Sequence, residues 1–174
     1  LQERGELVNL PDILGRYRVH TASLSSSILN GRVMAVASQL GALSALRRRA
    51  GKADIVFTRE VHGELKAAST LEAMLAIASK QLEAGEMEHL RIAAGVKLME
   101  LSGYRPFELE TSDCSFIRAA LPFAKALSIR NQKEVMWHIT TTAARLIRKG
   151  RLSEALALTP PSAYPKTAAR VLAR

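Results

Sequence analysis

The sequence is poor in the residue types from which many functional sites are built. Its 174 residues include a single cysteine, and aromatic residues make up only 5% of the chain. One cysteine cannot form an internal disulfide or a cysteine-based metal framework, so the composition fits a reducing compartment. The sequence also has no apolar run that reaches the roughly 18 residues needed to cross a bilayer. We therefore expect neither a disulfide-stapled fold nor a membrane span.

The motifs of common enzyme classes are missing as well. The four histidines are His20, His62, His89 and His138, and none of them has another histidine four residues away. Gly51-Lys52 is similar to the end of a phosphate-binding loop, but Leu46 and Ala53 stand where that motif needs Gly and Ser or Thr. The sequence therefore predicts no metal site, no cofactor and no small-molecule substrate.

Cys114 is the only candidate nucleophile. We expect it at the start of a helix, where the helix dipole favours a thiolate. Its candidate partner is His138, on the neighbouring predicted helix. Single buried cysteines are much more common than catalytic ones, so we predict that the protein is not an enzyme.

Helical patterns dominate what is present. Hydrophobic residues make up 48% of the chain, and they recur at the three- and four-residue spacing of a helix face. We expect helices over residues 22–49 (interrupted at Asn30-Gly31), 69–84, 86–102, 116–127 (broken at Pro122), 131–149, 152–158 and 165–174. Residues 55–57 form the only strand-like run, and we expect a loop or a helix start there. The fold class is therefore all-α, built from antiparallel helical hairpins.

The hairpins look like copies of one another. A shift of 45 residues places Leu90 on Val135 and Ala94 on Ile139, and a shift of 41 places residues 33–38 on residues 74–79. A period of about 40–45 residues made of helix pairs is typical of a short α-solenoid. Any two amphipathic hairpins also align apolar on apolar, so an irregular helical bundle remains the alternative.

The expected organisation has three parts. Residues 1–20 form an N-terminal extension, residues 21–158 form the helical-hairpin repeat domain, and residues 159–174 form a basic C-terminal extension. Residues 1–10 lack the positively charged start and long apolar core of a secretory signal. A presequence removed before Leu1 would leave no trace.

Three segments, MAVASQLGAL, LAIASKQLEAG and RKGRLSEALAL, carry a family resemblance. They resemble helix pairs of organellar helical-repeat proteins, the pentatricopeptide and octotricopeptide group, over about residues 25–158. The resemblance implies RNA binding or the building of an organellar ribonucleoprotein, such as a mitochondrial ribosome. It also implies a mitochondrial or other organellar matrix, with the cytoplasm as the alternative location. The residues that read bases in that group cannot be assigned in this sequence.

Positive charge is concentrated at the two ends of the chain. The net charge is +9 and the isoelectric point is near 10.2. Residues 1–52 carry a net +5 and residues 130–174 a net +7, whereas residues 53–129 carry −3. Such a distribution indicates contact with a polyanion at both ends.

Two basic clusters stand at expected helix ends. The first contains Arg47, Arg48, Arg49 and Lys52, and the second contains Arg145, Arg148, Lys149 and Arg151. Arginine forks match phosphate geometry, although basic residues at a helix C-terminus also complement the helix dipole. We predict phosphate contacts for both clusters and also for Arg16, Tyr17, Arg18, Lys166, Arg170 and Arg174. Tyr17 and Tyr104 are the candidates for stacking on a base.

These observations favour one function and leave a second open. The first is an RNA-contacting architectural subunit of a large ribonucleoprotein, with rRNA backbone and neighbouring proteins as partners. The alternative is a helical-repeat adaptor that binds acidic protein partners or an anionic surface. In that case methionines would line a groove, although they are more often core residues; the candidates are Met74, Met87, Met99 and Met136.

Overall fold

The computed structural model describes residues 8, 11 and 26–173. The predicted N-terminal extension therefore lies largely outside the described residues, as do Arg16, Tyr17, Arg18 and Arg174. The described chain contains eight α-helices: α1 (Ile28–Arg49), α2 (Arg59–Ala67), α3 (Leu71–Ala78), α4 (Ala84–Tyr104), α5 (Thr111–Ala120), α6 (Ile129–Arg148), α7 (Leu152–Leu158) and α8 (Tyr164–Leu172). Three short 3-10 helices join them: η2 (Ser79–Gln81), η3 (Leu121–Ala126) and η4 (Pro161–Ala163). No strand occurs in the described residues, and the predicted all-α class is confirmed.

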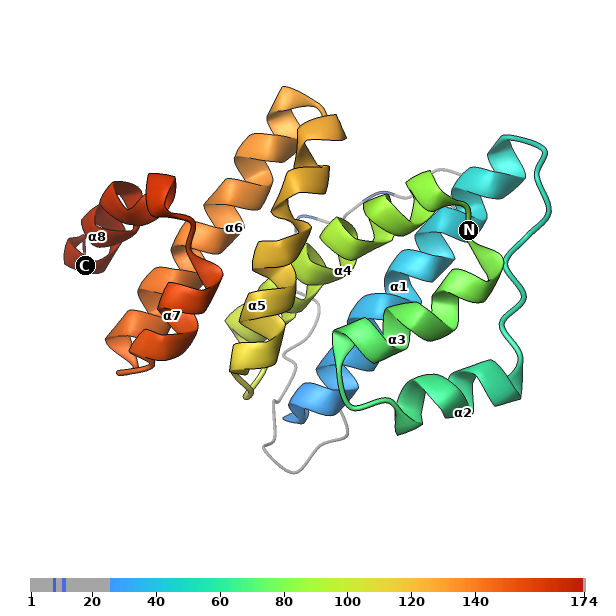
Figure 1. Ribbon diagram of the computed structural model, residues 1–174, viewed down its shortest axis with the longest axis horizontal. Helices are drawn as coiled ribbons and strands as arrows, with labels where there is room; N and C mark the ends of the chain where they lie inside the picture. The colour runs from blue at the N-terminus through green and yellow to red at the C-terminus, as the bar shows by residue number, and fades with distance from the viewer. Residues whose placement is uncertain (1–7, 9–10, 12–25, 174) are drawn as a thin grey trace.

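The helices form two rows that run along the molecule (Figure 1). The long helices α1, α4 and α6 pack in sequence, and α8 continues their row against α6. The shorter helices α3, α5 and α7 form the second row, while α2 packs against α1 and α3. Each helix thus contacts helices close to it in the chain, as in a short solenoid. The segment 159–174, expected as an extension, contains α8 and joins this stack.

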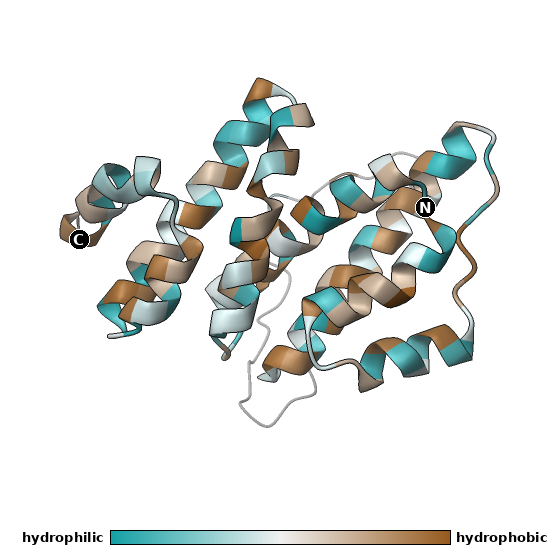
Figure 2. Cartoon of the chain, in the orientation of Figure 1, coloured by the Kyte–Doolittle hydropathy of each residue, from teal (hydrophilic) through white to brown (hydrophobic). Residues whose placement is uncertain are grey.

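The 45-residue repeat is visible in the burial pattern. Helices α4 and α6 begin at Ala84 and Ile129, 45 positions apart. The apolar residues paired by that shift are all buried: Leu90, Ala94 and Leu101 in α4, and Val135, Ile139 and Leu146 in α6. Hydrophobic and hydrophilic residues alternate along the helices (Figure 2). Both halves of the repeat therefore bury the same helix face.

Some helix ends lie where the sequence predicts them, and others do not. Gly51 and Gly150, with φ of 68° and 75°, follow the C-terminal ends of α1 and α6 as expected. Gly85 was expected to end a helix, but it lies in the first turn of α4. A capping box between Glu83 and Glu86 starts that helix, because each side chain accepts a backbone N–H of the other residue.

The spacing of a capping box in the sequence predicts N-caps at Ser69 and Asn131, and both predictions are wrong. Thr70, not Ser69, caps α3, and Ser128, not Asn131, caps α6. Each cap oxygen accepts the backbone N–H three residues later. The sequence offers two polar candidates near each start, and the backbone conformation selects between them.

Gly31 does not interrupt α1, contrary to the sequence expectation. It is helical and buried, and a Cβ at this position would lie 2.5 Å from Cζ of Phe107. The glycine therefore allows the segment after α4 to lie close against α1. Its role is close packing rather than a turn.

A buried ion pair fixes α1 to α5. Arg32 and Asp113 are only 4% and 1% exposed, and the guanidinium donates to both carboxylate oxygens at 2.7 and 2.8 Å. Arg32 also donates to Glu110 at 2.6 Å and to the Ser69 carbonyl at 2.7 Å. This network compensates the free-energy cost of burying the charged Arg32 guanidinium in the apolar interior.

Candidate nucleic-acid interface

The first predicted basic cluster is largely engaged within the chain. Arg47 at the end of α1 forms a two-pronged ion pair with Glu86, at 2.8 and 2.5 Å, and donates to the Gln81 carbonyl at 2.9 Å. Lys52 donates to Glu83 at 3.0 Å. These contacts fasten the end of α1 to the start of α4.

The other two residues of this cluster are more exposed. Arg48 pairs with Asp54 at 2.7 Å. Arg49 is exposed and has no ion pair with a described residue. The cluster thus presents much less unpaired charge than its sequence indicates.

The second predicted cluster is engaged in the same way. Arg145 pairs with Glu108 at 3.2 Å and donates to the Ser102 hydroxyl at 2.6 Å. Lys149 pairs with the same carboxylate, and Arg151 pairs with Glu154 at 2.6 Å. These side chains connect the end of α6 to α4, to the loop after it and to α7.

Arg148 differs because its partners are carbonyl groups. Its guanidinium donates to the carbonyl oxygens of Arg170 and Ala173, the latter at 2.8 Å. These carbonyls lie at the C-terminal end of α8, where a cation complements the helix dipole. Arg148 therefore holds α8 against α6 while its charge is not cancelled by a carboxylate.

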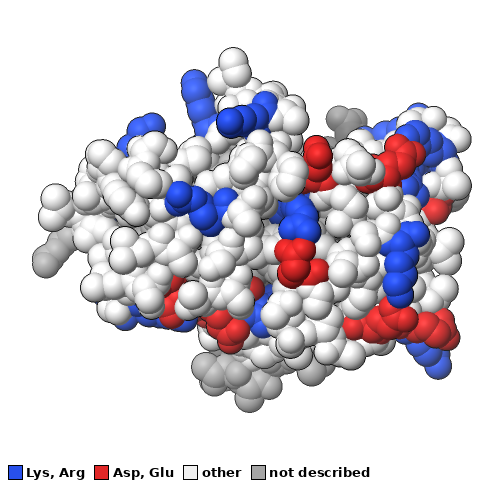
Figure 3. Space-filling model, in the orientation of Figure 1, with Lys and Arg blue, Asp and Glu red and all other residues white. Residues whose placement is uncertain are grey.

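Four other basic side chains lie on α6 and α8, at the C-terminal end of the helical stack. Arg130 and Lys133 lie on α6, and Lys166 and Arg170 lie on α8. None of the four has an ion-pair partner among residues 26–173. On the face drawn in Figure 3, the upper left shows blue side chains without red ones, whereas red and blue alternate over the α1–α4 half. The upper part of this face over α6 and α8 therefore carries positive side chains without neighbouring negative ones.

The helix dipole does not explain two of these positions, those of Arg130 and Lys166. Arg130 and Lys166 lie in the first turns of α6 and α8, and neither turn contains an acidic residue. The N-terminal end of a helix is already positive, so a cation there is electrostatically unfavourable for folding. An external anion would relieve this repulsion. Arg130 and Lys166 differ in this respect from most arginines of the two predicted clusters, which lie in the last turns of α1 and α6.

A groove of about 690 Å³ runs between α6 and α8 beside these charges. Lys133, Lys166 and Arg170 line it together with Trp137, and no Asp or Glu is among its lining residues. Its other walls are Ile129, Gln132, Met136, Thr140 and Ala169. The groove therefore combines positive charge with apolar and aromatic surface.

Trp137 is the aromatic centre of this groove. Half of its surface is exposed, and the guanidinium carbon of Arg170 lies 5.9 Å from the centroid of its ring. The ring of His138 meets it edge-on, with centroids 4.9 Å apart. A cation on the ring and a neighbouring ring hold the indole in one orientation.

Lys166 and Arg170 are among the residues predicted from the sequence, whereas Arg130, Lys133 and Trp137 are not. A usable signal was present, because Arg130, Lys133 and Trp137 are spaced three and four residues apart and share one face of a helix. That helix face carries positive and aromatic residues instead of the core stripe. The predicted Tyr104 is exposed, with the guanidinium carbon of Arg105 5.4 Å from its ring centroid, but it lies at the end of α4, outside the groove.

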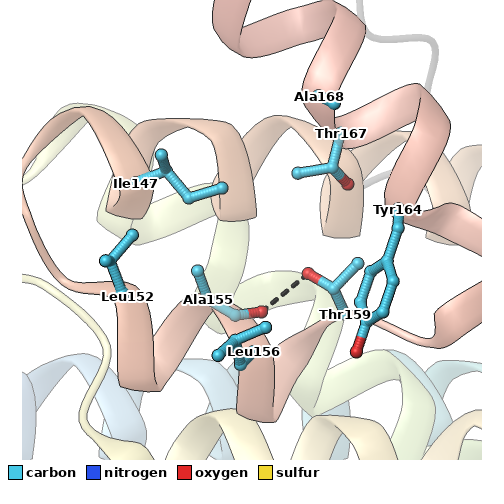
Figure 4. Close-up of a pocket in the computed structure, with 8 residues that line it drawn as sticks. All are labelled: Ile147, Leu152, Ala155, Leu156, Thr159, Tyr164, Thr167 and Ala168. Atoms are coloured by element: carbon cyan, nitrogen blue, oxygen red, sulfur yellow. Dashed lines mark hydrogen bonds between the residues drawn. The ribbon is translucent and has the colours of Figure 1, made fainter.

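A second cavity, of about 260 Å³, is apolar (Figure 4). Leu152, Leu156 and Tyr164 form its exposed rim, and Ile147, Ala155, Thr159, Thr167 and Ala168 complete the lining. The Thr159 hydroxyl donates to the Ala155 carbonyl at 2.7 Å and so offers little to a ligand. The cavity carries no charged lining residue and suits an apolar group.

Cys114 does not have the environment of a nucleophile. It is fully buried in α5, and burial, with the neighbouring Asp113 carboxylate, raises the pKa of the thiol to about 12. The expected favourable effect of the helix start on the thiolate is therefore wrong, because desolvation dominates. Burial also lowers the pKa of His138.

Two further properties concern the described residues as a whole. No group of three or more His, Cys, Asp or Glu side chains in this part of the chain is arranged to hold a metal ion. No helix formed by these residues has both the length and the apolar character required to cross a bilayer.

Comparison of the chain with models of known protein families, with curated proteins and with solved structures gives no match.

Proposed function

We propose that the protein binds RNA through phosphate contacts on its α6–α8 half, as an architectural subunit of a ribonucleoprotein. One observation carries the proposal: three basic side chains without carboxylate partners, Lys133, Lys166 and Arg170, line a groove without acidic residues. Arg130, on the same helix as Lys133, is also without a carboxylate partner among the described residues. Clustered positive charge increases the affinity for RNA, because each neutralised phosphate releases counterions.

The rest of the solenoid supports an architectural role. Ion pairs between residues far apart in the sequence hold its helices together. Examples are Arg32–Asp113 between α1 and α5 and Arg47–Glu86 between α1 and α4. The basic residues used in these pairs contribute to rigidity and are not part of the proposed contact surface. An organellar ribosome and a matrix location rest only on the family resemblance and stay predictions.

A pair of charge-neutralising variants tests the proposal. The double variant Lys133→Gln/Lys166→Gln removes two exposed charges from the groove. The matched control, Arg59→Gln/Lys66→Gln, removes two exposed charges from α2, which have no ion pairs with described residues. We expect the groove variant to weaken RNA binding about tenfold or more at 100 mM salt, measured by fluorescence anisotropy, and the control to retain most of the affinity. Equal losses in the two variants would contradict a localised site.

Protein–protein contact is the second candidate function, and a different surface favours it. Leu152, Leu156, Tyr164 and Leu172 expose 57%, 63%, 44% and 83% of their surface, and the first three border the apolar cavity. By contrast, Met74 and Met99 are buried in the core and do not line a groove. Co-purification separates the two functions: bound RNA gives a high 260/280 absorbance ratio that salt removes, whereas an adaptor retains a stoichiometric protein partner without RNA.

A further inference from the structure

We infer that the α6–α8 groove takes a single-stranded segment of RNA, with one unpaired base stacked on Trp137 and the adjoining phosphates at Lys133 and Lys166. This inference rests on the proposed function and names the form of RNA that the site selects. It adds a stacking residue beside the C-terminal charges, whereas the residues predicted from the sequence to stack, Tyr17 and Tyr104, belong to other parts of the sequence.

The exposure of Trp137 is the first step of the argument. It is the only tryptophan of the chain, and half of its surface is in contact with solvent. Transfer of a large aromatic ring out of water lowers the free energy. An exposed aromatic ring in a groove therefore indicates a place where a flat apolar group binds. Nucleobases are such groups, and stacking on an aromatic side chain is a main source of affinity for single strands.

The position of the charges is the second step. Lys133 precedes Trp137 by one helical turn, and Lys166 and Arg170 approach from α8 on the other side of the groove. The indole ring therefore lies between cations that belong to two different helices. A base on the ring leaves its flanking phosphates directed toward these cations, which is the arrangement that a continuous strand needs.

The neighbours of the ring are the third step. Arg170 covers part of the indole at 5.9 Å, and its carbonyl is fixed by Arg148. A planar guanidinium stacks on bases as well as on indole. The ring and the guanidinium thus form one platform, which has little conformational freedom to lose when a base binds.

Single strands are favoured over duplexes by this geometry. In a duplex the bases are stacked on one another, so none can lie on the indole without being flipped out, which has an energetic cost. A duplex offers the groove only its phosphates. The site therefore distinguishes the two forms through Trp137 and not through its charges.

The intrinsic fluorescence of Trp137 provides the test, because no other tryptophan contributes to the signal. The full chain is titrated with a 12-nucleotide oligouridylate, with a duplex RNA and with polyphosphate, while binding is followed separately by anisotropy or competition. We expect the oligouridylate to quench the emission, and polyphosphate to bind with much less quenching. Equal quenching by polyphosphate would overturn the inference.

Two variants complete the experiment. Trp137→Leu should weaken oligouridylate binding about tenfold, a change of about 1.4 kcal/mol, and leave duplex binding unchanged, whereas Trp137→Phe should retain most of the affinity. Circular dichroism confirms the fold of both variants. If Trp137→Leu binds oligouridylate as tightly as the parent chain, the stacking inference is wrong and the proposed phosphate contacts stand. If neither RNA binds the parent chain, the proposed function is wrong as well.

Discussion

The guanidinium of Arg170 lies over the indole of Trp137, 5.9 Å from the ring centroid. The two residues belong to α8 and α6, so their contact joins the last two helices of the row formed by α1, α4, α6 and α8. Arg148 strengthens the same junction by donating to the carbonyl of Arg170. A cation, an aromatic ring and a groove without carboxylates therefore occur at one place, where the described structure leaves positive charge unpaired.

Substitution of two glycines in α1 should change stability in opposite directions. Gly31→Ala places a methyl group 2.5 Å from the Phe107 ring, which must shift in a packed interior, and we expect a loss of about 1–3 kcal/mol. Gly41→Ala meets no atom within 4 Å on the exposed side of the same helix, and we expect a gain of up to about 1 kcal/mol. Urea unfolding measures both. Stabilisation by Gly31→Ala would show that the close approach to Phe107 is not required.

The buried ion pair between α1 and α5 should be essential as a pair. Asp113→Asn leaves the Arg32 guanidinium buried without its main carboxylate partner, and we expect a loss of about 3–5 kcal/mol in the free energy of unfolding. Glu110→Gln is the control, because its side chain is 54% exposed, so we expect a much smaller loss. Comparable losses in the two variants would contradict the dominance of Asp113.

Acid should destabilise the chain partly through Glu86. The hydrogen bonds from Arg47 lower the pKa of this carboxyl from 4.5 to about 2. Its stabilising contribution is therefore complete above pH 4.5 and is lost as the pH falls from 4.5 towards 2. Glu86→Gln should flatten the fall of Tm over that range, whereas Glu88→Gln, an exposed control on the same helix, should not. Identical pH profiles for Glu86→Gln and the parent chain would refute this assignment.

The thiol of Cys114 should be inert in the folded protein. Its pKa of about 12, raised mainly by burial, leaves almost no thiolate at pH 8. We expect the native chain to react with Ellman's reagent about a thousandfold more slowly than the urea-unfolded chain. Rapid labelling of the native protein would show that the thiol is accessible and would reopen a chemical role for it.

The fold was more predictable from the sequence than the site, for a physical reason. Helix faces and ends depend on residues within a few positions, so the stripes of α4 and α6 and the glycines after α1 and α6 could be identified. The partners of the basic residues are remote: Arg47 and Glu86 are 39 residues apart, and Arg32 and Asp113 are 81 apart. Only the packing of the helices shows which charges are already paired.

The same reason explains why Lys133 and Trp137 were not predicted as site residues. The exposure of Trp137 could not be predicted, because it depends on how α8 crosses α6. Lys133 shares a helix face with Trp137, but the groove that both residues line forms only where Lys166 and Arg170 approach from α8. The groove is a property of tertiary structure that local patterns do not contain.

The salt dependence of RNA affinity tests the central claim most directly. For the parent chain we expect the logarithm of the binding constant to fall linearly with the logarithm of salt concentration. Each single-strand phosphate contact contributes a slope of about −0.7, so Lys133→Gln/Lys166→Gln should reduce the steepness by about 1.4, whereas Arg59→Gln/Lys66→Gln should leave it nearly unchanged. An unchanged slope in the groove variant, or an RNA affinity that does not respond to salt, would contradict RNA binding at the α6–α8 groove.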